Sequence, residues 1–540
     1  MLAGVKDAVA RAAAALRVDE DARRLGALAL RVLAPGEVVL PEGSPAGSAD
    51  DVEALLRADD RHLDLARGTT LLACEDAPAV DPERVLDEVA HLAWALRQCL
   101  RAVPRRDPAR RLEVTNAFFF EALGFQAASA RATRDGNERL GDLLLPHVLR
   151  RRRGHCVGLS SVYLAVGTRA GLPLFGVSAP GHFFVRWDGQ GLRRNVETTA
   201  RGAPHPDEHY VERFRIARPL VDRGVYLQSL RRREVLVEVL NNRANFWWDR
   251  GDVARAARDL DRIVQVSHNF ARAYVGRGYL ALQRGELLAA RADLARAVEI
   301  APEDPRAHLL LGEVALRLGR LDEAERAFDR AVATDEHAAL ACTNLGRVHG
   351  RRGAWDEALR WHERALAADR ASHVAWNNLG VARRATGDVD GARAAFRTAA
   401  RLRPDFLAAR ENLLLLGRRD DGLGWTGRLR LERLRRAYER RLRRAPHDDE
   451  GRAAFVRLLL EADPRPDRAL EVAREGVRAH RSVRSLETQA VALRRAGDAA
   501  GAAAALEAAL ALDRERGGFE AERLQAALER ARQGGVESDA

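Results

Sequence analysis

The stretch AWNNLGVARRATGDVDGARAAFRTAARLRP, residues 375–404, decides the fold of the middle of the chain, because its small residues recur every 34 positions. Four columns of glycine or alanine keep this step and stay in register with one another. They are Gly278, Gly312, Gly346 and Gly380; Gly251, Gly285, Gly319, Gly353 and Gly387; Ala256, Ala290, Ala324, Ala358 and Ala392; and Ala297, Ala331, Ala365 and Ala399. A fixed period of this length is typical of stacked structural repeats.

The pattern resembles the tetratricopeptide repeat family, which implies an all-α solenoid with two helices in each repeat. Small residues in the first glycine column and in the alanine columns let these helices approach closely. The second glycine column ends the first helix and opens a tight turn. We predict five repeats in residues 237–406: 237–270, 271–304, 305–338, 339–372 and 373–406. The first is degenerate, with Arg243, Ala244 and Trp247 where leucine, glycine and a tyrosine-like residue are expected.

The chain behind the array is less regular. Residues 407–446 are expected to hold a break near 417–427 and then a basic helix. One face of that helix carries Leu431, Leu434, Tyr438 and Leu442, and we interpret the arginines opposite them as a solvated face. Further degenerate repeats are predicted at 447–520, followed by a C-terminal helix and tail at 521–540.

Stacked repeats expose a concave groove lined by the first helix of each pair, so the array predicts a bound protein or peptide partner. The polar residues that we expect in this groove are Asn344, Arg347, Arg351, Asn377 and Asn378. Asparagine at such positions can clamp a peptide backbone or a carboxylate. It can equally cap helices or pack between them, and the sequence leaves both interpretations open.

Composition limits the other classes of function. The 540 residues are 46% apolar, enough for more than one buried core, and we expect neither a signal peptide nor a membrane span. Four cysteines without paired spacing favour a reduced, cytoplasmic protein. The net charge of +11 invites a nucleic-acid interpretation. Lys6 is the only lysine, however, which indicates a GC-rich genome that uses arginine for surface cations, so we regard nucleic-acid binding as disfavoured.

Residues 51–230 follow a helical extension predicted at 1–50, and their sequence pattern differs from that of the array. Helices are expected at 52–66 and 82–100, and a compact aromatic helix at 116–125. A further helix starts at Cys156, directly after four arginines at 150–153. The positive end of the helix dipole and nearby cations stabilise a thiolate, so this is a place for a reactive cysteine.

Strands are predicted at 172–179, 182–187 and 192–199, and the last two form a hairpin around Asp188-Gly189-Gln190-Gly191. If all four turn residues form the loop, His182 lies opposite Glu197. If only Asp188 and Gly189 form it, His182 lies opposite Asn195. Either register gives the imidazole a polar partner and completes a cysteine, histidine and carboxylate or amide arrangement.

Several segments resemble the transglutaminase-like, papain-type core and, more narrowly, the SirB-type transglutaminase-like family of bacteria. They are Leu63–Gly68, Asn116–Phe125, Asn137–Leu140, Arg153–Cys156, Leu159-Ser160, Gly171–Leu174, Pro180–Val185 and Asn195–Thr199. The resemblance implies an α+β domain in which Cys156 attacks an amide or ester carbonyl. It implies His182 as the base, Glu197 as the residue that orients it, with Asn195 as the rival, and backbone N–H groups near Cys156 as the oxyanion hole.

Two hypotheses from different classes remain. In one, the protein is a cysteine-dependent hydrolase or acyltransferase whose repeats recruit the substrate. In the other, the core is catalytically silent and the protein is an interaction adaptor. A metal site built from His147, His155 and His182 lacks the spacing of zinc ligands, so we expect neither a metal nor a cofactor.

Overall fold

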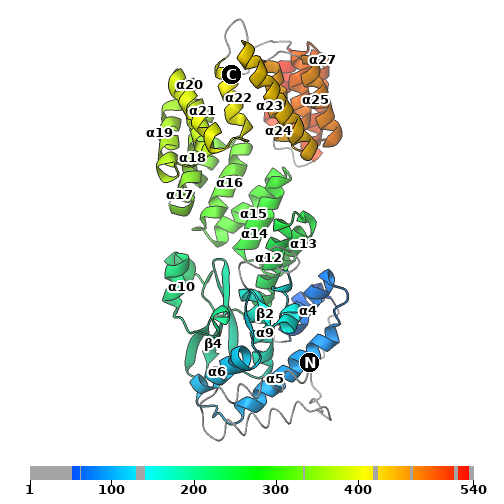
Figure 1. Cartoon of the computed structure of the whole chain (residues 1–540). Helices are drawn as coiled ribbons and strands as arrows, with labels where there is room; N and C mark the ends of the chain where they lie inside the picture. Colours follow the sequence, from blue (N-terminus) through cyan, green and yellow to red (C-terminus); the bar gives the residue numbers. More distant parts are fainter. Residues whose placement is uncertain are drawn as a thin grey trace. The chain divides into compact units, whose positions relative to one another are not determined.

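The computed structural model describes residues 51–60, 62–128, 140–332, 335–417, 424–462, 466–515 and 521–533. The predicted N-terminal extension at 1–50 lies outside them, as do much of the 137–140 segment and the end of the C-terminal tail. The chain forms two compact units (Figure 1). The first runs to Leu280 and includes Glu299–Glu303, and the second comprises Ala281–Val298 and the chain from Asp304 onward.

The first unit combines helices with a small antiparallel sheet. Its elements are α3 (Val52–Arg57), α4 (Leu65–Asp76), α5 (Pro82–Leu100), α6 (Pro108–Asn116), η1 (Ala117–Ala122), β1 (Gln126–Ala127), α8 (Leu145–Arg151), β2 (Arg153–Gly154), α9 (Cys156–Arg169), β3 (Leu174–Ala179), β4 (His182–Gly189), β5 (Leu192–Val196), η2 (Thr198–Ala200), α10 (Asp207–Phe214), α11 (Arg218–Asp222), α12 (Arg232–Asp249) and α13 (Val253–Val266). Helix α14 (Ala271–Gln283) begins in this unit.

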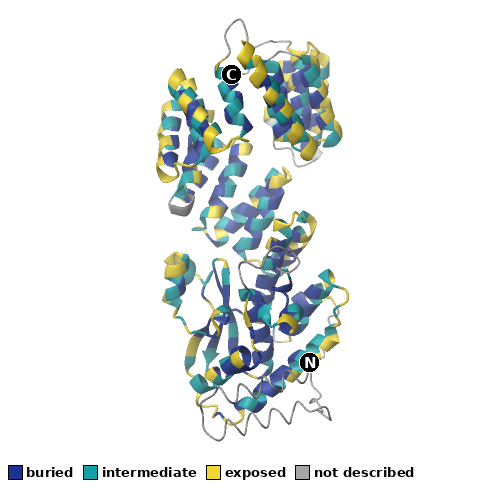
Figure 2. Cartoon of the chain, viewed as in Figure 1, coloured by how far each residue is buried: buried dark blue, intermediate teal, exposed yellow. Residues whose placement is uncertain are grey.

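Helix α9 is the centre of this unit. It packs against β3 and β4 on one side and against α4, α5 and α12 on the other. Every residue from Val157 to Gly167 is buried, which explains why this helix shows little amphipathic pattern (Figure 2). A buried helix that starts at Cys156 therefore holds that residue on a rigid element.

Two of the predicted helices differ in the structure, whereas the helix at 82–100 is confirmed. Residues 52–66 are not one helix, because the chain is extended at Ala58 and Asp64 caps a new helix by accepting from the N–H groups of Ala66 and Arg67. The aromatic segment is a π-helix over Ala117–Ala122 that follows α6 directly. Its three phenylalanines are buried in the core.

The order of the sheet is β3-β4-β5, and both predicted registers of its second hairpin are wrong. Gly189 pairs with Leu192, so the turn consists of Gln190 and Gly191 alone. Both turn residues have positive φ, 57° and 79°, as a type I′ turn requires. Arg186 consequently lies opposite Asn195, and Glu197 is the first residue beyond β5.

The first helix pair of the predicted array, α12 and α13, is packed onto the N-terminal domain. Arg243 is only 2% exposed and donates to both carboxylate oxygens of Asp259, at 2.8 and 2.6 Å. It also donates to the carbonyl of Leu72 and to the carboxylates of Glu75 and Asp76 on α4. The arginine that made the first repeat look degenerate is therefore a link to the preceding domain.

The second unit is helical throughout its described residues. Its elements are α15 (Leu287–Ile300), α16 (Pro305–Arg317), α17 (Leu321–Val332), α18 (Asp335–Arg351), α19 (Trp355–Ala368), α20 (His373–Ala385), α21 (Val389–Leu402), α22 (Leu407–Leu416), α23 (Trp425–Arg444), α24 (Asp449–Glu461), α25 (Pro466–Ala479), α26 (Val483–Arg495), α27 (Ala499–Glu515) and α28 (Ala521–Arg532). Among the described residues, no helix is long and apolar enough to cross a membrane.

The glycine columns take the roles predicted for them. Residues of the second column, such as Gly319, Gly353 and Gly387, have φ between 74° and 87° in the turns between paired helices, a conformation that favours glycine. In the first column, a Cβ on Gly312 would lie 2.6 Å from the Phe328 ring, so the glycine is needed for close packing. The paired-helix repeat architecture is thereby confirmed.

Candidate functional site

Cys156 is the first residue of α9, as the sequence predicts. Helix α8 ends at Arg152, which has a left-handed conformation, and the short strand β2 then leads to His155 at the N-cap. The first bond of the helix runs from the Leu159 N–H to the His155 carbonyl. The amides of residues 156–158 therefore point out of the positive end of the helix, beside a half-buried thiol.

His182, the first residue of β4, connects Cys156 to Glu197. Its Nε2 lies 2.7 Å from Oε2 of Glu197. The Cys156 thiol also interacts with the ring and helps to raise its pKa. Because Nε2 faces the carboxylate, Nδ1 is the nitrogen left for the sulfur. The His182 side chain is 13% exposed and that of Glu197 only 4%, so the interaction is largely removed from solvent.

This environment changes the protonation of both groups. Burial lowers the pKa of His182, but its interactions with Cys156 and Glu197 outweigh this effect and raise that pKa to about 9. Burial likewise raises the pKa of Glu197, but hydrogen bonds from His182 and Thr199 bring it below its usual value. An imidazolium between a sulfur and a carboxylate is therefore the favoured state at neutral pH.

Glu197 reaches His182 although the two residues are not opposed in the sheet. Extending the observed register would place His182 opposite Thr199. Glu197 precedes Thr199 by two residues, so it is the diagonal neighbour of His182 on the same face. Diagonal neighbours on one face remain within reach of a long side chain. Thr199 holds the other carboxylate oxygen with its N–H at 3.1 Å and its hydroxyl at 2.5 Å.

Asn195, the alternative orienting residue, has other partners. Its Oδ1 accepts from Nε of the buried Arg186 at 2.7 Å. Its Nδ2 donates to the carbonyl of His205 and to the carboxylate of Asp207. Asn195 thus belongs to a network that joins β4 and β5 to the start of α10, and of the two rivals the structure brings Glu197 to His182.

Aromatic side chains from α10 border the histidine, and the sequence analysis missed them. The Phe214 ring stacks on His182 with centroids 5.5 Å apart, and the Tyr210 hydroxyl lies 3.3 Å from Oε2 of Glu197. Tyr210 itself stacks on Phe184 of β4 at 4.0 Å. No local spacing relates α10 to the hairpin, so only the tertiary structure could reveal these neighbours.

The four arginines before Cys156 do not form one cationic group around the sulfur. Arg152 donates to the carbonyl of Leu123 and lies over the Phe125 ring, and Arg153 lies 3.9 Å from Asp142. Arg150 and Arg151 occupy the last turn of α8.

Burial makes the other three thiols less acidic. It raises the pKa of Cys74 and Cys342, and it raises that of Cys99 to about 11.

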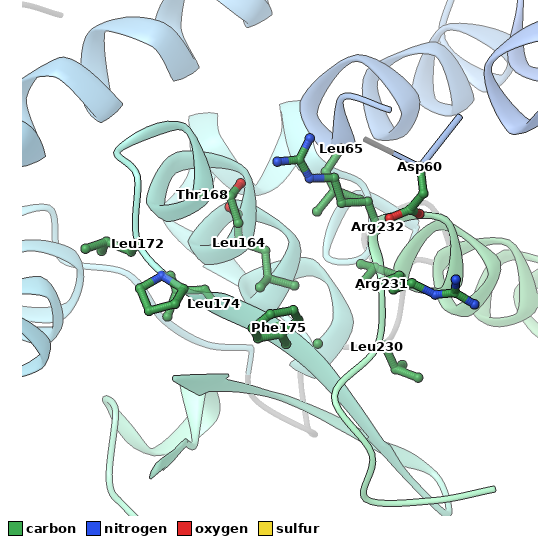
Figure 3. A pocket seen from close by; sticks show the side chains of 13 residues that line it. Asp60, Leu65, Leu164, Thr168, Leu172, Leu174, Phe175, Leu230, Arg231 and Arg232 are labelled. Atoms are coloured by element: carbon green, nitrogen blue, oxygen red, sulfur yellow. The ribbon is translucent and has the colours of Figure 1, made fainter. Parts of the chain in front are cut away.

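A cavity of about 200 Å³ in this unit lies away from Cys156 and His182, which are not among its lining residues. Leu164 and Thr168 place it at the opposite end of α9, where Figure 3 shows it bordered by β3 and the start of α12. Five leucines form part of its walls, together with polar residues that include Arg232 and Asp60. The cavity therefore offers no route to the thiol.

The residues predicted for the groove form hydrogen bonds with one another along the second unit. Arg347 donates to Asn344 at 2.9 Å and to Glu313 of the preceding repeat at 2.8 Å. Asn412 donates to Asn377 at 2.9 Å, and Asn377 to Asn378 at 3.4 Å. Arg351, the last residue of the same helix as Asn344 and Arg347, is exposed. These side chains form a polar ladder on successive first helices.

Models of known protein families match two regions of the chain. Residues 83–241 match the model of the transglutaminase-like superfamily. Residues 241–305, 275–339 and 343–406 match the model of the tetratricopeptide repeat. The chain thus carries a transglutaminase-like domain followed by an all-α array of tetratricopeptide repeats.

Proteins from two bacteria are similar to part of the chain. A "UPF0162 protein" of Xylella fastidiosa (strain 9a5c) is 27% identical over 235 residues, 43% of this chain and 81% of that protein. A "UPF0162 protein" of Vibrio cholerae is 33% identical over 117 residues, which cover 21% of this chain and 41% of that protein. Among solved structures, YrrB, described as "a TPR protein with an unusual peptide-binding site", is 23% identical, with 32% of this chain and 88% of that chain covered and a TM-score of 0.28.

Proposed function

We propose that this chain, which joins a transglutaminase-like domain to tetratricopeptide repeats, is a cysteine-dependent hydrolase or acyltransferase. Its repeats bind a protein substrate or partner. The observation that carries this proposal is the position of His182, which is hydrogen-bonded to Glu197 and also interacts with the Cys156 thiol at the start of α9. We assign the domain to the SirB type, on the segments quoted above, and expect the reduced cysteines to work in the cytoplasm.

In the first half of the reaction, the Cys156 thiolate attacks the carbonyl carbon of an amide. The carbon–sulfur bond forms while the carbonyl electrons move to the oxygen, where the amides at the start of α9 can donate to it. When the intermediate collapses, the carbon–nitrogen bond breaks, and the leaving amine takes the proton of the His182 imidazolium. The product of this half is a thioester on Cys156.

In the second half, His182 is neutral and acts as a base. It removes a proton from water or from a primary amine as that nucleophile attacks the thioester carbonyl. The carbon–sulfur bond then breaks, and Cys156 leaves as the thiolate beside a reprotonated His182. Glu197 is a positioning residue throughout, because it holds Nε2 and favours the imidazolium without contacting the substrate.

The first test measures the alkylation of Cys156 by iodoacetamide with peptide mass spectrometry. In the folded chain at pH 7 we expect Cys156 to react at least tenfold faster than in urea, because only the fold brings His182 and the start of α9 together at the sulfur. Cys74, Cys99 and Cys342 serve as internal controls and should react faster in urea. A folded-state rate at Cys156 no higher than in urea would leave the adaptor hypothesis as the better one.

The second test separates orientation from packing. Glu197→Gln keeps the shape of the side chain but removes the charge that favours the imidazolium, so the pKa of His182 should fall from about 9. The alkylation rate of Cys156, followed against pH, should then change its profile, and His182→Ala should abolish the enhanced rate. An unchanged profile in folded Glu197→Gln would contradict the role given to Glu197.

The third test concerns pH. Release of the amine needs protonated His182, so incorporation of a fluorescent primary amine into a mixed protein pool should decline above pH 9. Alkylation needs only the thiolate and should not decline there. Cys156→Ala is the blank for the incorporation assay, and equal incorporation by this variant would refute acyl transfer through the sulfur.

A further inference from the structure

Most of the net positive charge of the chain is concentrated on one helix. Helix α23 contains nine arginines and two glutamates, a net charge of +7, whereas the whole chain carries +11. Twenty residues therefore hold more than half of the excess charge, although they are a small part of the sequence. A general use of arginine on every surface does not explain such a local excess.

The packing of α23 leaves this charge on the outside of the second unit. Leu431, Leu434 and Tyr438 are buried against α22 and α24, where Tyr438 stacks on Phe455 at 5.4 Å and donates to Glu411. The opposite side is exposed (Figure 2). Residues spaced by three or four positions form an outer stripe along it. The outer stripe consists of Trp425, Leu429, Arg433, Arg436, Arg440 and Arg443.

Acidic side chains of the chain neutralise only part of this helix. Glu432 pairs with Arg435 and Arg436, and Asp448 pairs with Arg441. Across the described residues, Arg433, Arg440 and Arg443 have no acidic partner within salt-bridge distance, and the same holds for Arg430 and Arg444. Five guanidinium groups on a helix about 30 Å long are thus available to an external anion.

We propose that the outer stripe of α23 binds the phosphate backbone of a nucleic-acid strand. Guanidinium groups bind phosphates in a bidentate manner, and a row of them matches a ligand with one negative charge per nucleotide. Trp425, with 79% of its surface exposed, lies at the end of the row, where it can stack on a base. This activity is independent of the thiol chemistry proposed above.

The structure favours a nucleic acid over a membrane as the anion. A helix that lies on a bilayer inserts its apolar face between the lipids. In α23 that face is already buried in the protein, and only Trp425 and Leu429 remain exposed as large apolar groups on this helix. Because arginine side chains dominate the outer stripe, we expect contacts with the phosphate backbone and little sequence preference.

The test uses the full chain and a fluorescein-labelled, mixed-sequence single-stranded DNA of 20 nucleotides, with an RNA of the same sequence in parallel. Fluorescence anisotropy in 50 mM salt should show binding that weakens as salt increases. Substitution of Arg433, Arg440 and Arg443 by glutamine should weaken binding at least tenfold. The slope of log K against log salt should fall by about 2, because three phosphate contacts are lost from a single strand. Trp425→Ala should weaken binding about tenfold without changing that slope.

The matched control replaces Arg393, Arg397 and Arg401 of α21 by glutamine, which removes the same charge from another helix. Circular dichroism and the unfolding temperature of each variant show whether it is folded. The proposal is overturned if the wild-type chain does not bind either oligonucleotide, or if both triple variants weaken binding equally. It is also overturned if the α23 variant loses binding only to vesicles of phosphatidylglycerol and phosphatidylcholine.

Discussion

The first repeat and the later ones use the same two-helix frame but pack it with different chemistry. In the first, Arg243 and Asp259 form a buried ion pair between α12 and α13, with Glu75 and Asp76 of α4 beside it. In the third repeat, the positions 68 residues further on are Leu311 and Ala327, and Gly312 fits against Phe328. The two helices of the third repeat meet through an apolar contact, whereas those of the first repeat meet through charges that also contact α4 of the N-terminal domain.

The difference shows that a repeat which departs from its pattern can be specialised rather than decayed. Arg243 is 2% exposed and Asp259 is 1% exposed, so neither charge is solvated. Burial raises the pKa of Asp259, while the guanidinium of Arg243 opposes that rise. Each charge is acceptable only because the other is present. The degenerate residue is therefore the one that connects the array to the domain before it.

The largest expected effect comes from Arg243→Ala, which removes one partner and leaves Asp259 buried without its main cation. We expect a loss of about 3–5 kcal/mol in local stability. Hydrogen exchange of peptides from residues 236–263 would measure it. Arg277→Ala, 34 residues further on, is the matched control: Arg277 is half-buried and pairs with Asp261, so its loss should cost less than about 1 kcal/mol. Equal effects would contradict the special role of Arg243.

A smaller effect is expected from Gly312→Ala, because the added Cβ would lie 2.6 Å from the Phe328 ring. Overpacking of this kind costs about 1–3 kcal/mol. The first repeat has Ala244 and Leu260 at the corresponding positions. Adding Phe328→Leu to Gly312→Ala should therefore recover part of the loss, as measured by exchange of peptides from residues 305–332. A loss in the double variant equal to the sum of the losses in Gly312→Ala and in Phe328→Leu would show that the two residues are not coupled.

A change in the opposite direction, a stabilisation, is expected at neutral pH from His362→Phe. His362 stands where the neighbouring repeats have Phe328 and Phe396, it is 3% exposed, and its Nδ1 has no hydrogen-bond partner among the described residues. Removing an unsatisfied buried nitrogen should stabilise the repeat by about 1–3 kcal/mol at pH 7. Exchange of peptides from residues 355–368 would report it, and destabilisation would show that the pocket requires the imidazole.

The same substitution should remove a pH dependence. Burial, followed by the charge of Arg347, lowers the pKa of His362 to about 4. Between pH 4 and 6.5 the unfolded chain binds a proton that the folded chain does not, so stability falls as pH decreases through this window. The advantage of the phenylalanine variant should therefore grow by about 2 kcal/mol between pH 7 and pH 5. An advantage that is constant over this range would mean that His362 titrates normally in the fold.

The hairpin shows why only part of the site could be predicted. Side chains alternate along strands, so His182, Asn195 and Glu197 fall on one face in the observed register and in both predicted ones. Whether Asn195 or Glu197 would lie opposite His182 depended on which residues form the turn. Asp-Gly is the usual signal for a type I′ turn, but here Gln190 and Gly191 adopt the positive φ values. The contact with Glu197 then arises on the diagonal, which no count from the turn anticipated.

By itself, the sequence determined the features that depend on spacing along the chain: the repeat period, the glycines of the turns, and a cysteine at the start of a helix. Periodicity places residues on a face, and that is a local property. The tertiary structure decided which faces meet. It brought Glu197 rather than Asn195 to His182, placed the α10 aromatics beside the ring, and made Arg243 the link to α4. These contacts join segments whose separation in sequence carries no periodic signal, so only the packed fold determines them.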